Sequence, residues 1–161
     1  MIMRFLAGFI LLVLVMITGV LFGGAGIAVY YDLSSTFILV LGSFFAILMF
    51  NSPREIRTAF VHAFAKEVDM TSNYETDIIL FASLHKILFT AGIIGLFTGG
   101  IAILNNPQDA SAIGSGLAQA LIINLYALIL QVLLTIPCKA MLKKKQSLQQ
   151  RNITASIPAI P

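Results

Sequence analysis

Charged residues are scarce in this sequence. Only 11% of its 161 residues are Asp, Glu, Lys or Arg, and 58% are hydrophobic. Soluble domains carry charge on about 25% of their residues. A soluble fold this apolar would have too little polar surface to present to water, so the composition favours a chain that resides in lipid.

The sequence is also poor in residues for metal or redox chemistry. Cys138 is its single cysteine, which excludes an internal disulfide and a multi-cysteine metal site. His62 and His85 have no partner at ligand spacing, so we expect both to be solvated or interfacial and predict no metal site. The sequence holds no recognisable nucleophile–base pair or phosphate-binding glycine loop. We therefore expect neither an enzyme nor a resident cofactor.

Long apolar runs dominate the remainder. A spanning helix needs about 20 mostly apolar residues, and four runs reach or approach that length: Phe5–Phe22, Ser35–Phe50, Ile87–Leu104 and Leu117–Met141. All ten basic residues fall before the first run, between the second and third, or from the end of the fourth onward. The positive-inside rule then predicts an all-α, multi-pass protein with four transmembrane helices and both termini in the cytoplasm. Because the basic residues flank apolar runs, we expect lipid and not nucleic acid as their partner.

The first run has a second interpretation. Arg4 and the small residues Ala25–Ala28 resemble the basic end and the cleavage site of a secretory signal peptide. The apolar stretch is long for that role, so we favour a membrane helix.

The chain divides into four parts: transmembrane helices one and two (1–50), a cytoplasmic segment (51–86), helices three and four (87–145) and a tail (146–161). In the cytoplasmic segment, Ser52 and Glu55 predict a capping box that opens an amphipathic helix. Ser72 and Glu75 predict a second box, opening a helix that continues into the third span. We expect a short helical hairpin there, and a disordered tail from Gln146, which lacks an apolar period.

Glycines recur at helical spacing in two of the runs. In lipid, small residues allow helix backbones to approach closely. We therefore predict helix packing at five positions: Gly19, Gly23, Gly92, Gly95 and Gly99. The spacing does not distinguish packing within one chain from packing between subunits.

No ionisable residue lies deep within any of the four runs. Such a residue is the usual mark of a proton relay or an ion site. If this chain handles ions, the titrating carboxylate must therefore belong to another chain. Asn124 is the most conspicuous polar residue in a run, and an unpartnered amide in hydrocarbon is costly. It should make a helix–helix hydrogen bond or face a wet pore.

Several stretches together suggest a family. They are Tyr31–Ser35, Ile38–Ser43, Pro53 before an amphipathic helix, Gly92–Gly95 with Gly99, Ile113–Leu121, and Leu125–Tyr126 continuing to Pro137 and a lysine-rich end. This series resembles the flagellar stator A subunits (MotA and PomA) of the MotA/TolQ/ExbB proton channel family. Two helices before the cytoplasmic segment favour the MotA branch.

The resemblance implies an ion-driven membrane motor. In that family a homo-oligomer of five A subunits surrounds two copies of a single-span B subunit (MotB- or ExbD-like), whose aspartate carries H⁺ or Na⁺. By this resemblance we expect Leu96, Thr98, Asn124 and Tyr126 to line the pore or interface, and Pro137 to shape the inner end of helix four.

The sequence departs from the family pattern in its third and fourth helices. Leu96 replaces a frequent threonine, Phe89 a proline, Ile123 and Asn124 a threonine pair, and Ala127 a glycine. The cytoplasmic domain is reduced to a single hairpin, and no rotor-contact residue is carried over. The leading hypothesis is a compact MotA-like channel-forming subunit. The alternatives are a non-conducting tetraspan scaffold and, less favoured by the missing intramembrane charges, a small transporter working alone.

Overall fold

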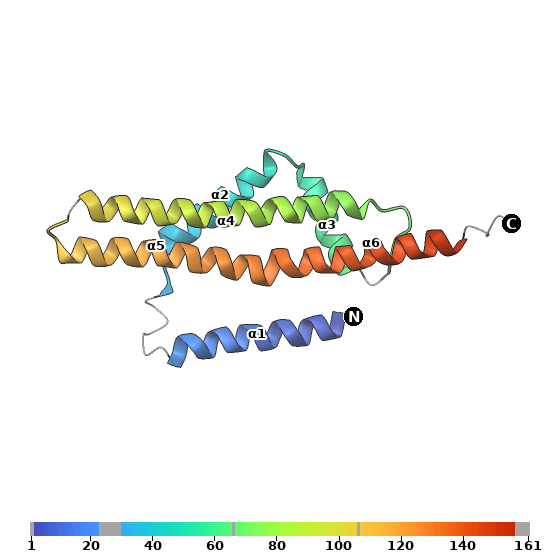
Figure 1. Cartoon of the computed structure of the whole chain (residues 1–161), viewed down its shortest axis with the longest axis horizontal. Coiled ribbons are helices and arrows are strands. Elements are labelled where there is room, and N and C mark those ends of the chain that lie inside the picture. Colours follow the sequence, from blue (N-terminus) through green and yellow to red (C-terminus); the bar gives the residue numbers. More distant parts are fainter. Residues whose placement is uncertain (1, 23–29, 66, 106, 157–161) are drawn as a thin grey trace.

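The computed structural model describes residues 2–22, 30–65, 67–105 and 107–156, and every regular element in that part of the chain is helical. The elements are α1 (Ile2–Phe22), α2 (Leu33–Leu48), α3 (Pro53–Phe64), α4 (Tyr74–Asn105), α5 (Ala110–Leu130), the π-helical turn η2 (Gln131–Thr135) and α6 (Ile136–Ser156). Helix α4 and the α5–η2–α6 rod lie side by side and antiparallel (Figure 1), and α2 packs across both α4 and α5. This long pair is the framework of the protein.

Two helices are long and apolar enough to cross a membrane: Tyr74–Asn105 and the continuous rod Ala110–Ala155. A third candidate arises only if α2 and α3 are counted as one broken span, because the chain bends by 105° between them. Helix α2 has 16 residues, fewer than the ~20 that an untilted span requires. Helix α1 has 21 residues, and Ala7–Gly19 is its apolar stretch among the residues whose side chains are described. The protein is therefore a helical membrane protein with two or three candidate spans, and the four-span topology stays a prediction.

Local hydrogen bonds explain why α2 and α3 are separate helices. The Asp32 carboxylate caps α2 by accepting from the Ser35 N–H at 3.0 Å. The hydrogen bond from the Ser35 hydroxyl is the main cause that holds the pKa of Asp32 below its ordinary value. The predicted capping box of α3 is confirmed: the Ser52 N–H donates to the Glu55 carboxylate at 2.7 Å, and the Glu55 N–H donates to the Ser52 hydroxyl at 3.3 Å. This box starts a new helix just after α2 ends.

The second predicted capping box is wrong. Helix α4 begins at Tyr74, and the side chain that accepts from its first turn is that of Asn73, which lies 3.5 Å from the Thr76 N–H. The Ser72 hydroxyl is engaged elsewhere, because it donates to the Asp69 carboxylate at 2.7 Å. The helix itself then runs without a break through Asn105, as the sequence predicts.

His62 is not merely solvated. Its Nδ1 lies 2.7 Å from the Asp77 carboxylate and its Nε2 3.2 Å from the Ser72 hydroxyl, so it joins α3 to α4 and to the loop between them. In the same loop, the backbone N–H and hydroxyl of Thr71, followed by Ser72, lower the pKa of Asp69 to about 2. A dense polar network therefore fixes the α3–α4 connection.

The larger core lies where α2, α3, α4 and α6 meet. Its buried members are Ile47, Ala59, Ala63, Tyr74, Leu80, Phe81, Cys138 and Leu142. Along the apolar lengths of α4 and α5, by contrast, many large side chains stay exposed, including Phe97 (65%) and Leu121 (57%). Exposed apolar side chains in such numbers suit lipid or a protein partner, not water.

The predicted disorder of the tail is wrong as far as Ser156. Helix α6 continues through the polar residues after Gln146. The side-chain amide of Gln149 donates to the carbonyls of Met70, at 2.9 Å, and Ser72, at 3.2 Å. These long-range bonds stabilise a helix that has no apolar period of its own. Residues 157–161 lie outside the described part of the chain.

Candidate functional site

Glycines of α4 form its contact with α5, and this α4–α5 contact is called the seam. Gly92, Gly95 and Gly99 are buried on α4, one turn apart. A Cβ added at Gly99 would lie 2.5 Å from the carbonyl oxygen of Gly116 and 2.6 Å from Ala120 Cβ, and one added at Gly95 would overlap Ile123. These glycines allow the two backbones of one chain to approach closely. Their packing partners are therefore intramolecular in this structure.

The glycines of the first helix behave differently. Nothing lies within 4 Å of the Cβ position at Gly19. This residue borders an apolar cavity of about 520 Å³ between α1 and α5, which Leu125 and Ile129 also line. Gly23 lies outside the described residues, so its predicted packing is not addressed.

Leu96 and Thr98 lie on the outer side of α4. Leu96 is 49% exposed, and Thr98 is exposed as well. The Thr98 hydroxyl donates to the carbonyl of Gly95 in its own helix at 2.9 Å. Both side chains are therefore available to lipid or to a partner.

Asn124 lies at the opposite side of the seam, half-buried against α4. Its side-chain amide donates to the carbonyl of Ala120 in its own helix at 2.9 Å. Its Oδ1 lies 3.0 Å from where a Cβ at Gly92 would stand. The sequence left two roles open for Asn124: a helix–helix hydrogen bond or a place facing a pore. Among the described residues its amide bonds only within α5, so the helix–helix bond is not formed. The pore-facing role stays a prediction.

Tyr126 ties α5 to the segment before α2. Its hydroxyl donates to the carbonyl of Tyr30 and accepts from the backbone N–H of Asp32 at 3.1 Å. These two bonds connect positions more than 90 residues apart in sequence. Tyr126 therefore positions the N-terminus of α2 and does not face the same side as Leu96 or Thr98.

Replacing Tyr126 by Phe is expected to loosen this connection. The change removes the hydroxyl and leaves the ring, so the loss should be about 1–3 kcal/mol, the cost of two hydrogen bonds in a half-buried place. Amide exchange at residues 30–36 should rise, while exchange in the α4–α5 seam stays the same. Exchange that rises equally throughout the chain would show that Tyr126 does not act locally.

Pro137 follows the π-helical turn η2. A proline within a helix lacks the N–H donor and crowds the carbonyl one turn earlier. Here the Ile136 N–H donates to the carbonyl of Gln131, five residues back, which widens the helix just before the proline. Pro137 is half-buried at this point. The helix is thereby irregular near the C-terminal end of its apolar stretch.

The widened turn carries a polar cluster that the sequence analysis missed. The Thr135 hydroxyl donates to the Gln131 carbonyl at 3.1 Å and lies 3.2 Å from Nδ1 of His85 on α4. Gln131 and Thr135 are both buried, and Nε2 of Gln131 has no hydrogen-bond partner. The spacing Asn124, Gln131 and Thr135, which places all three on one face of the helix, could have indicated this cluster.

The four predicted lining residues thus occupy three different environments. Leu96 and Thr98 are exposed on α4, Asn124 lies at the seam, and Tyr126 holds the start of α2. Two of the positions that depart from the family pattern have a packing role, since Ile123 lies against Gly95 and Ala127 lies against Gly92. Within one chain these side chains do not form a single polar track.

The fold and this helix pair define the class: a helical membrane protein built on two long, closely packed apolar helices. No family model matches the chain. Over 85 residues, which are 53% of this chain and 34% of the relative, it is 36% identical to motility protein A of Aquifex aeolicus (strain VF5). Over 65 residues, 40% of this chain and 25% of the relative, it is 38% identical to motility protein A of Borreliella burgdorferi (strain ATCC 35210 / DSM 4680 / CIP 102532 / B31).

The resemblance predicted from the sequence is therefore confirmed, and the chain is a divergent MotA-like protein. The matched parts span about a third and a quarter of the two curated relatives. A match over so small a part of each relative shows that the sequences are similar. It does not transfer the activity or partners of the complete relatives, which are proposals for this chain.

Proposed function

We propose that this chain is a channel-forming A subunit of an ion-driven membrane motor. In this proposal it spans the bacterial inner membrane four times with both termini inside, and about five copies surround a single-span partner. The partner supplies the carboxylate that carries H⁺ or Na⁺. Motility is the process that the names of the two relatives suggest.

One observation carries the proposal: the apolar stretches of the two long helices expose large hydrophobic side chains and contain no charged residue or histidine. From Ile87 to Asn105 and from Ala110 to Thr135 there is no Asp, Glu, Lys, Arg or His. An ion crossing lipid needs a compensating charge. The exposed faces of α4 and α5 are therefore best explained by neighbouring helices that include one with a carboxylate.

A specific observation favours the second candidate, a non-conducting scaffold. Ile123 and Ala127 fill the seam with apolar groups at positions where the resemblance places threonine and glycine. A subunit that lost its polar lining could still assemble with a partner. The two functions differ in whether ions flow through the assembled complex.

The test is ion flux in liposomes with and without the partner. The chain should be purified together with a single-span protein encoded beside it, the subunits counted, and the complex reconstituted. The motor proposal expects an oligomer that conducts only with the partner present. A stable monomer, or ion-selective current from the chain alone, would refute the proposal. An assembled complex that conducts no ions would favour the scaffold.

Asn124→Leu separates the two functions further. It removes the one amide at the seam that could contact an ion or its carrier, so coupled flux should fall to background while assembly persists. Ser115→Ala is the matched control, because Ser115 is exposed on the same helix and its hydroxyl bonds only the Ala112 carbonyl, at 3.1 Å. Unchanged flux in Asn124→Leu would contradict a role of this amide in conduction.

A further inference from the structure

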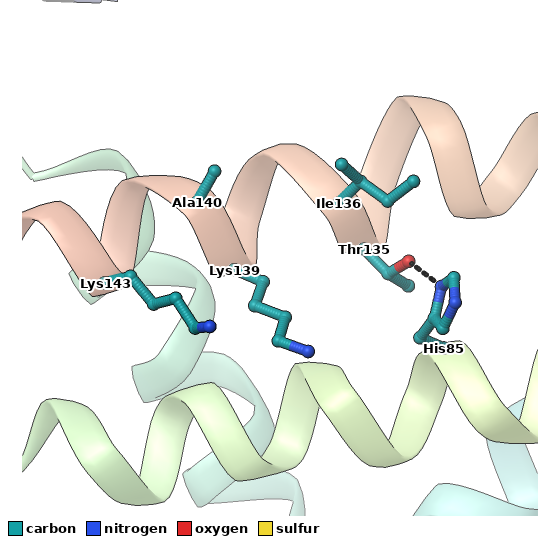
Figure 2. A pocket seen from close by; sticks show the side chains of 6 residues that line it. All are labelled: His85, Thr135, Ile136, Lys139, Ala140 and Lys143. Atoms are coloured by element: carbon teal, nitrogen blue, oxygen red, sulfur yellow. Dashed lines mark hydrogen bonds between the residues drawn. The ribbon is translucent and has the colours of Figure 1, made fainter.

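A basic pocket lies between α4 and α6 near the widened turn. It has a volume of about 310 Å³ and is lined by His85, Thr135, Ile136, Lys139, Ala140 and Lys143. Figure 2 shows Lys139 and Lys143 extending from α6 into the space beside α4, on the same side as His85. The two lysines are four residues apart, so their side chains share one helix face. Three potential donors thus meet in one small cavity.

The positive charge of this pocket is not neutralised within the described part of the chain. No acidic residue lines the cavity, and the one ion pair among the described residues joins His62 to Asp77. The Thr135 hydroxyl donates to the Gln131 carbonyl and therefore accepts from Nδ1 of His85. This bond orients the imidazole at one end of the pocket. The pocket is suited to an anion.

The pocket lies where the apolar lengths of both helices end. On the rod, Lys139 is the first charged residue after the uncharged stretch from Ala110 to Cys138, and on α4, Lys86 is the last before the uncharged stretch from Ile87 to Gln108. These two boundaries coincide because the helices are antiparallel (Figure 1). Ile136, 50% exposed, gives the same pocket an apolar edge. In a membrane-spanning helix, such a boundary between charged and apolar residues is where lipid headgroups are met.

We propose that this pocket binds the phosphate of an anionic phospholipid. Lys139 and Lys143 would pair with the phosphate oxygens. The acyl chains would follow the exposed apolar surface that begins at Ile136. Basic pockets between helices on the cytoplasmic side of a membrane have the chemistry for such headgroups. This inference is independent of whether the chain conducts ions.

The test is lipid retention by the purified full-length chain. Native mass spectrometry in micelles doped with phosphatidylglycerol or phosphatidylcholine measures how many lipids stay bound. We expect a preference for phosphatidylglycerol that falls about tenfold in the double variant Lys139→Gln/Lys143→Gln, because two lysine–phosphate contacts are lost. Addition of inorganic phosphate should not displace the lipid, since phosphate lacks the acyl chains.

The matched control is Lys144→Gln/Arg151→Gln. It removes the same charge from exposed positions of the same helix that do not line the pocket. Retention of phosphatidylglycerol in this control should match the unchanged chain, and circular dichroism should give both variants the same helix content. The proposal would be overturned by equal losses of phosphatidylglycerol retention in the two double variants, by equal retention of the two lipids, or by displacement of the lipid by inorganic phosphate.

Discussion

Gly99→Ala is expected to destabilise the α4–α5 pair by about 1–3 kcal/mol, although it adds a single methyl group. The added Cβ would lie 2.5 Å from the carbonyl oxygen of Gly116, and 3.1 Å from the Cα of Ala120. Both are backbone atoms and cannot move aside as a flexible side chain can. The two helices must separate, and the contacts on either side of the crossing weaken with them.

Gly100→Ala is the control for this change. Gly100 is the next residue on the same helix, and nothing lies within 4 Å of its Cβ position. Because alanine has the better helix propensity, this variant should be as stable as the unchanged chain or slightly more so. Unfolding in a detergent–SDS titration measures both. If the two variants lose the same stability, the seam does not depend on close approach at Gly99.

Lys145→Met is expected to free the end of α3. Lys145 is 1% exposed, and its ammonium group donates to the carbonyl of His62 and, at 2.7 Å, to that of Ala65. These carbonyls lie at the C-terminal end of α3, where a helix has no partners of its own for them. Methionine keeps most of the side-chain volume and removes the charge. We expect a local loss of about 2 kcal/mol, the contribution typical of charged hydrogen bonds.

Hydrogen exchange provides the measurement. A loss of this size corresponds to roughly 30-fold faster exchange at the C-terminal end of α3 and in the following loop, provided that these amides exchange by local opening. Lys144→Met is the control, because Lys144 is exposed beside Lys145 on the same helix. Unchanged exchange in Lys145→Met would show that packing alone holds α3 in place.

The hairpin and the tail show where sequence reasoning succeeds and where it fails. The Ser52–Glu55 box was predictable because its two partners are three residues apart and need no other part of the chain. The helical tail was not predictable, because Gln149 and Lys145 bond to carbonyls about 80 residues away in the sequence. The same limit applies to Tyr126 and Tyr30. Local capping is encoded locally, whereas these contacts exist only after the helices have packed.

In the candidate site, too, local features were predictable from the sequence and contacts between distant residues were not. Glycine spacing predicted close helix packing but not its partner, and the structure places that partner on α5 of the same chain. Asn124 stood out because it is an amide well inside an apolar run, while His85 on α4 meets Thr135 in the π-helical turn before Pro137 only in the packed structure. Residues from two helices cannot be seen to meet until the register of those helices is known.

The sequence by itself determined the apolar character of this protein, the uncharged stretches 87–105 and 110–138 of its two long helices, and its resemblance to motility protein A. These properties follow from composition and order, which do not depend on packing. Only the tertiary structure decided that α2 stops and bends into α3, that the glycine seam is intramolecular, and that a basic pocket forms beside α6. Each of these depends on how distant segments fit against one another, because side chains far apart in sequence compete for the same space and the same hydrogen-bond partners.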